Sequence, residues 1–225
     1  MISRIEEIDS APSLIFIGDY IDKGTDPKTT LSYLSELSLR LDCTFLMGNH
    51  EYYWLLLEKG NQEIEDYLLK YGGSSTMESF KAKNLFETKK KMLDSFKDFF
   101  EQLIPFWQND RYLVVHSGVS PSYYDIPIEE IPIENLLFNR YDFISQERLF
   151  QNSRKIIFGH TGFYTPFVDD YKIGIDTGAY FLKSQPLTAF CLEEEFFINS
   201  QNATIALKSI PSGVCPNIPR IKPSA

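Results

Sequence analysis

Short apolar runs, several of which end at a glycine, recur along the chain. The first two are SLIFIGD at residues 13–19 and CTFLMGN at residues 43–49. Apolar runs of about four to eight residues bounded by turn residues are typical of strands buried in a sheet. The second half of the chain supplies five more strand-like runs in succession: RYLVVHSG, KIIFGH, YKIGIDTG, PLTAFCL and TIALKSI.

In the stretches before and between these runs, apolar residues recur at helical spacing. The first nine residues, MISRIEEID, carry isoleucine at every third position, which predicts a helix. Residues 26–41 predict another helix, with Asp26 as its cap, Pro27 at its first position and leucines recurring downstream. Residues 52–110 are polar and aromatic and mostly helical in pattern. The strand, helix and strand over residues 13–49 predict a βαβ unit with a right-handed crossover.

The size and composition of the chain favour one globular domain. Its 225 residues are 43% hydrophobic, which is ample for one packed core and little for two. We expect a domain over residues 1–210. Residues 211–225, with their prolines and polar residues, predict a loose tail.

Charge and hydropathy restrict the partners of the protein. The net charge of −9 argues against a nucleic-acid partner, because a phosphate backbone needs a basic face. A phosphate substrate is still compatible with this charge, since bound divalent cations would supply positive charge locally. The sequence has no apolar run of about 18 residues and no signal-peptide core near Met1. We therefore expect a cytoplasmic protein with no membrane partner.

The candidate chemistry lies where the strand-like runs end. The chain contains three histidines, and each follows such a run: His50, His116 and His160. FIGDYIDKG, with Asp19 and Asp22, shows the same order of strand and glycine-bearing turn. The ends of parallel strands converge where open α/β sheets place their ligands. A lone histidine would more often be an ordinary core or surface residue, but three of them with Asp19 and Asn49 suit a cation such as Mn, Fe or Zn.

Five segments carry a family resemblance, in order, over nearly the whole chain. GDYIDKG resembles the G-D-x-V-D-R-G segment of the phosphoprotein phosphatases, a bacterial-type serine/threonine group of the calcineurin-like metallophosphoesterases, and GNHE is their G-N-H-E segment unchanged. VHSGVSP resembles their H-G-G-L/I-x-P segment, FGHT their late G-H-T segment, and LLFNRYDF their arginine-bearing stretch. The resemblance implies an α/β fold of the metallophosphoesterase type, an αββα sandwich of two mixed β-sheets flanked by helices.

The resemblance also implies a metal centre. Members of the family hold two divalent ions, such as Mn, Fe, Zn or Ni, which share a bridging hydroxide that attacks phosphorus in line. Asp19 would bridge the two ions. One site would be completed by three further ligands: Asn49, His116 and His160.

Four more residues receive roles from the same resemblance. His50 would be the general acid that protonates the leaving group, and Asp22 would orient it. Arg140 would bind phosphoryl oxygens with its forked guanidinium, and Lys23 stands where the family usually has another arginine. Lysine is a point charge without the planar fork, so phosphate orientation would be poorer, and Lys23 at a turn is also compatible with a solvent-facing role.

One family segment has no counterpart in the printed sequence. Members begin with a strand that ends in G-D-x-H-G and supplies the ligands of the second metal, so we expect the first strand to be missing and only one metal site to be complete. Three functions stay open at this point. The first is hydrolysis of phosphate monoesters, on phosphorylated proteins or small phosphoesters. The second is hydrolysis of dinucleoside polyphosphates, and the third is an inactive relic that binds one metal or phosphate.

Overall fold

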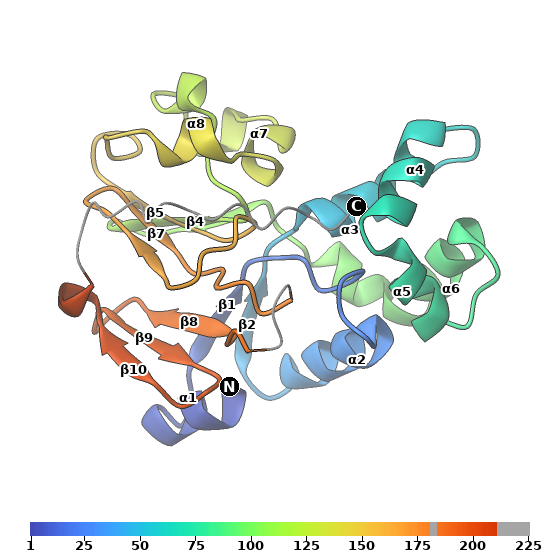
Figure 1. The fold of residues 1–225 in the computed structure, drawn as a ribbon, viewed down its shortest axis with the longest axis horizontal. Helices are drawn as coiled ribbons and strands as arrows, with labels where there is room; N and C mark the ends of the chain where they lie inside the picture. The colour runs from blue at the N-terminus through green and yellow to red at the C-terminus, as the bar shows by residue number, and fades with distance from the viewer. Residues whose placement is uncertain (181–183, 211–225) are drawn as a thin grey trace. The chain divides into compact units, whose positions relative to one another are not determined.

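The computed structural model describes residues 1–180 and 184–210, and the chain divides into two compact units (Figure 1). We call residues 11–106 the helical unit, and residues 1–10 together with the chain from Trp107 onward the sheet unit. The expected single domain over residues 1–210 stays a prediction. The expected tail over residues 211–225 lies outside the described residues.

The helical unit begins with the predicted strand, helix and strand. Strand β1 (Ser13–Phe16) pairs in parallel with β2 (Asp42–Phe45), and helix α2 (Pro27–Leu37) connects them. The Asp26 side chain accepts a hydrogen bond from the Thr29 backbone N–H at 3.2 Å, and this cap fixes the start of α2. Most residues of β1 are half-buried rather than fully buried as predicted, because within this unit β1 and β2 form a sheet of two strands.

Four further helices complete the helical unit. They are α3 (Asn49–Leu56), α4 (Gln62–Lys70), α5 (Gly73–Ser79) and α6 (Leu85–Glu101). Helix α2 packs against α5 and α6, and α4 packs against α3 and α5 (Figure 1). Helices α2, α3, α4 and α6 turn apolar side chains inward, and Leu31, Trp54 and Met92 are completely buried. This core fixes the direction in which α3 leaves the end of β2.

The sheet unit contains a mixed sheet with strand order β3-β4-β5-β7-β6. Its strands are β3 (Phe106–Gln108), β4 (Tyr112–Val115), β5 (Lys155–Phe158), β6 (Phe167–Val168) and β7 (Lys172–Gly174). Strands β4, β5 and β7 run parallel, whereas β6 is antiparallel to β7. The short helices α7 (Glu134–Leu137) and α8 (Tyr141–Ile144) lie over one face of this sheet (Figure 1). Because β4 and β5 are parallel neighbours, their C-terminal ends lie at the same edge of the sheet.

A second, antiparallel sheet lies in the same unit. Strands β8 (Thr188–Cys191), β9 (Phe196–Asn199) and β10 (Thr204–Ala206) pair in sequence order. Helix α1 (Ile2–Ile8), which the isoleucine spacing predicts, is linked to it by a 2.9 Å hydrogen bond from Arg4 to the Thr204 hydroxyl. The short 3₁₀ turns of the unit are Pro121–Tyr123, Ile128–Glu130 and Leu207–Ser209. The mixed α/β class with several sheets is thus confirmed.

The described helices also bear on the expectation about membranes. None of them combines the length and the apolar composition that crossing a bilayer requires.

Candidate active site

A strained turn follows β1 in the helical unit. Asp19 has a φ of 61° and Asp22 a φ of 76°, in the left-handed region that non-glycine residues seldom adopt. Such a conformation costs on the order of 1 kcal/mol for each residue and persists only when its surroundings hold it. Strain of this kind gathers at functional sites, and here it falls on two of the residues that the sequence singled out.

Glu51 holds this turn against the beginning of α3. Its Oε2 accepts hydrogen bonds from the backbone N–H groups of Asp19 at 2.9 Å and Gly48 at 3.0 Å. Its Oε1 accepts one from the backbone N–H of Tyr20 at 2.8 Å. Complete burial and the negative charge of Asp19 raise the pKa of Glu51 to about 7. One carboxylate therefore joins the GDYID and GNHE segments, although no local sequence pattern pointed to a role for Glu51.

Gly48 allows the two segments to approach each other. A Cβ at this position would lie 2.4 Å from the Asp19 backbone nitrogen, 2.5 Å from Asp19 Oδ1 and 2.6 Å from Glu51 Oε2. Real Cβ atoms essentially never come so close to other heavy atoms, so only glycine fits between these groups. The glycine of the GNHE segment is thus required by packing.

His50 and Asp22 form a buried pair. His50 Nδ1 lies 2.7 Å from Asp22 Oδ2, and neither side chain is more than 2% exposed. The other carboxylate oxygen of Asp22 accepts hydrogen bonds from Trp54 Nε1 at 2.7 Å and from the Thr76 hydroxyl at 2.6 Å. Burial lowers the pKa of His50, but Asp19 and Asp22 together outweigh it, so the pKa is raised above its usual value. The imidazole is therefore fixed in orientation and biased toward its protonated form.

Two more predicted site residues lie in the same unit. Lys23 Nζ lies 3.0 Å from Asp19 Oδ2, and the Lys23 side chain is 26% exposed, so its partner here is a carboxylate rather than solvent. Asp19 Oδ2 also lies 3.9 Å from His50 Nε2. Asn49 donates a 2.7 Å hydrogen bond from Nδ2 to the hydroxyl of Tyr67. The helical unit thus gathers five of the predicted residues: Asp19, Asp22, Lys23, Asn49 and His50.

The other two histidines meet in the sheet unit. His116 follows β4 and His160 follows the neighbouring parallel strand β5. His116 Nε2 lies 3.2 Å from His160 Nδ1, His116 is 2% exposed, and His160 has a φ of 64°. The backbone N–H of Gly159 donates to the His116 carbonyl at 2.8 Å, which fixes the two turns together. Two imidazole nitrogens that face each other are suited to share one cation.

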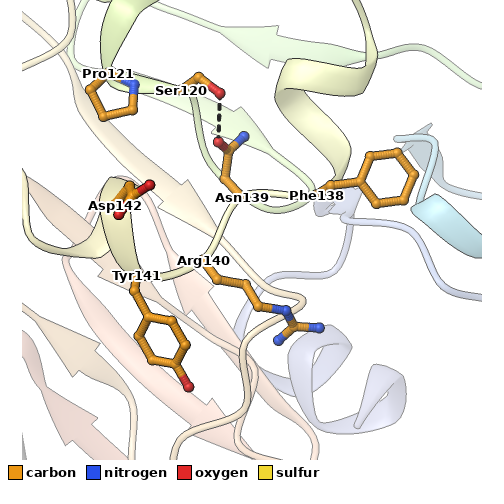
Figure 2. A pocket seen from close by; sticks show the side chains of 7 residues that line it. All are labelled: Ser120, Pro121, Phe138, Asn139, Arg140, Tyr141 and Asp142. Atoms are coloured by element: carbon orange, nitrogen blue, oxygen red, sulfur yellow. Dashed lines mark hydrogen bonds between the residues drawn. The ribbon is translucent and has the colours of Figure 1, made fainter.

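Arg140 lies in a pocket of the sheet unit, between α7 and α8 (Figure 2). The cavity has a volume of about 320 Å³ and seven lining residues: Ser120, Pro121, Phe138, Asn139, Arg140, Tyr141 and Asp142. Asn139 is fixed beside Arg140 because its Oδ1 accepts from the Ser120 hydroxyl at 2.8 Å and its Nδ2 donates to the Gly118 carbonyl at 3.1 Å. Arg140 Nη1 lies 3.5 Å from the His160 carbonyl oxygen. The guanidinium therefore lies close to the His116–His160 pair.

The donor chemistry of these residues fits a divalent metal. Asp19, in the helical unit, offers a carboxylate oxygen, and His116 and His160, in the sheet unit, offer imidazole nitrogens. A carboxylate oxygen and two imidazole nitrogens form a set that binds first-row divalent ions. That these three residues and Asn49 share one cation stays a prediction.

These features are those of a protein with metal-binding donors and a buried histidine–aspartate pair, and comparison with known proteins gives its class and family. The calcineurin-like phosphoesterase family matches residues 2–195, so the chain belongs to this family and is a metallophosphoesterase. A solved metallophosphoesterase from Sphaerobacter thermophilus is similar at 11% identity, covering 76% of this chain and 68% of that chain, with a TM-score of 0.42. No curated protein matches the chain.

Proposed function

We propose that the protein hydrolyses phosphate monoesters, on phosphoserine and phosphothreonine in proteins or on small phosphoesters. The single observation that supports it best is the buried His50–Asp22 pair, 2.7 Å apart, beside the carboxylate of Asp19. A histidine held by a carboxylate is a common general acid, and the strongly basic alkoxide that leaves from an alkyl phosphate ester such as phosphoserine benefits from protonation. Family membership supports the hydrolysis of phosphoesters, and the monoester substrate is our proposal.

The proposed metal ligands come from four segments of the chain. They are Asp19, Asn49, His116 and His160, and we propose that they complete one of the two sites of the family. A divalent ion held there (Mn, Fe, Zn or Ni) would supply Lewis acidity toward the phosphoryl group. Support for a joint role comes from the family match, which spans all four segments, and from the ligand chemistry of three of them. The αββα sandwich is part of the same proposal; in place of the two mixed sheets expected for it, the described strands form one parallel, one antiparallel and one mixed sheet.

His50 would deliver the proton. Its Nδ1 is committed to Asp22, so Nε2 is the nitrogen that can donate to a leaving oxygen. Against the effect of burial, the hydrogen bond to Asp22 raises the pKa of the imidazole and so favours the protonated form in which it can act as an acid. Trp54 and Thr76 hold Asp22 in place from its other oxygen, so the pair needs no rearrangement before it acts.

Arg140 and Lys23 would bind the phosphoryl oxygens. Arg140 offers two parallel N–H groups that suit a phosphate, and its pocket leaves room for the rest of a substrate. Lys23 pairs with Asp19 in the described structure. We propose that it exchanges this carboxylate for a phosphoryl oxygen when substrate binds.

Turnover of a substrate panel tests the proposed function. The chain would be assayed with Mn²⁺ on p-nitrophenyl phosphate, a phosphoserine peptide and diadenosine tetraphosphate. Hydrolysis of the first two supports the proposal. Hydrolysis of diadenosine tetraphosphate alone would reassign the substrate, whereas tight Mn²⁺ binding without turnover of any of the three would indicate a binding protein.

A further inference from the structure

Tyr67 makes a contact that the proposed mechanism does not use. It lies on α4, and its hydroxyl accepts a 2.7 Å hydrogen bond from Nδ2 of Asn49 at the start of α3. The two residues are 18 positions apart, and the packing of α3 against α4 brings them together. Asn49 itself is 1% exposed, so its amide is confined to a buried setting.

Neighbouring aromatic rings hold Tyr67 in place. Its ring centroid lies 3.9 Å from that of Tyr53 and 4.6 Å from that of Tyr71. The centroid of the His50 imidazole lies 6.3 Å from that of the Tyr67 ring. Ring pairs of this kind are more favourable than the burial of their area alone, so they stabilise the position of Tyr67. The hydroxyl of Tyr67 therefore has a fixed position beside Asn49.

The position of the Tyr67 hydroxyl determines which way the Asn49 amide is turned. A carboxamide has one oxygen, which can bind a cation, and one NH₂ group, which cannot. When the NH₂ group is committed to Tyr67, Oδ1 must point to the opposite side. We propose that Tyr67 is a positioning residue, which orients Asn49 so that its oxygen is presented to a divalent cation. This inference rests on the proposed role of Asn49 as a metal ligand.

The first test compares two tyrosine variants. Tyr67→Phe removes the hydroxyl that contacts Asn49, and Tyr71→Phe removes a hydroxyl from the adjacent ring in the same aromatic group. Calorimetric titration of the metal-free protein with Mn²⁺ should show an affinity about 10-fold lower for Tyr67→Phe, the lower end of what partners of ligands contribute. Tyr71→Phe should bind like the unmodified protein. Equal affinities for both variants would overturn the proposal.

The second test separates orientation from general weakening of the fold. In Asn49→Asp the ligand has two equivalent oxygens, so it needs no partner to choose between them. Adding Tyr67→Phe to Asn49→Asp should therefore change Mn²⁺ affinity by less than about twofold, within the range of independent sites. The same 10-fold loss in both backgrounds would assign Tyr67 a merely structural role.

A third variant separates this inference from the proposed function. His116→Ala removes a proposed ligand without touching Tyr67, and it should lower Mn²⁺ affinity sharply in the same titration. If His116→Ala binds Mn²⁺ normally, the proposed metal centre is wrong and the role of Tyr67 falls with it. If His116→Ala fails to bind and Tyr67→Phe binds normally, only the role of Tyr67 is wrong.

Discussion

The two units hold their site residues in different ways. In the helical unit, side chains far apart in sequence fix one another: Glu51 binds three backbone N–H groups, and Asp22 binds His50, Trp54 and Thr76. In the sheet unit, two adjacent parallel strands place His116 and His160, and backbone pairing sets their separation. A site built on strand register depends on few side chains, whereas one built on buried hydrogen bonds depends on many. The difference predicts which substitutions each unit tolerates.

The largest expected effect contrasts a histidine from each unit. His50→Ala removes the proposed acid and should lower kcat by about 10²–10⁴-fold, the usual contribution of acid–base catalysis. Metal affinity should change little, because Asn49 and the other ligands are untouched. His116→Ala should instead lower metal affinity sharply. Steady-state kinetics and Mn²⁺ titration of both variants check this, and loss of metal from His50→Ala would mean that His50 is a ligand.

A buried ion pair in the sheet unit gives the next largest effect. Lys172 is completely buried, its Nζ lies 2.8 Å from Asp169 Oδ2, and it also donates to the Gln146 carbonyl. Lys172→Ala leaves Asp169 without its cation and should lower the free energy of unfolding by about 3 kcal/mol. Urea denaturation measures this. Lys90→Ala is the control, because the Lys90–Asp94 pair is mostly exposed and should contribute less than about 1 kcal/mol.

The third effect tests the close approach at Gly48 in the helical unit. Gly48→Ala places a methyl group against Asp19 and Glu51 and should lower the free energy of unfolding by about 1–3 kcal/mol. It should also weaken catalysis, since the same contacts hold the turn that carries Asp22. Gly24→Ala is the matched control, because its Cβ would meet nothing within 4 Å. Equal stability of the two variants in urea would show that the turn yields easily.

The sequence predicted the parts of this picture that depend on local pattern. Glycine-bearing turns after apolar runs identified the positions of His116 and His160, and Asp26 with Pro27 identified the start of α2. Glu51 and Tyr67 were missed, because their roles depend on partners 32 and 18 positions away. The positive φ values of Asp19, Asp22 and His160 were also missed, since no local signal distinguishes them from other aspartates and histidines. One prediction remains untested. It is that the four proposed ligands bind the same cation.

The smallest effect tests whether the sheet unit also relies on side-chain hydrogen bonds. The Ser120 hydroxyl lies 2.8 Å from Asn139 Oδ1 and 3.1 Å from Asn135 Oδ1 in the Arg140 pocket (Figure 2). Ser120→Ala should lower the free energy of unfolding by about 1 kcal/mol. It should also raise KM more than it lowers kcat, because Arg140 would bind phosphate from a looser backbone.

Ser145→Ala is the control for Ser120→Ala, since its hydroxyl makes an exposed 3.1 Å hydrogen bond to the Asp142 carbonyl at the end of α8. Its stability should stay within about 0.5 kcal/mol of the unmodified protein. If Ser120→Ala matches Ser145→Ala in both urea denaturation and KM, strand register and backbone pairing alone hold this half of the site. If KM rises for Ser120→Ala only, side-chain hydrogen bonds hold site residues in both units. The units then differ in how many of these hydrogen bonds they use.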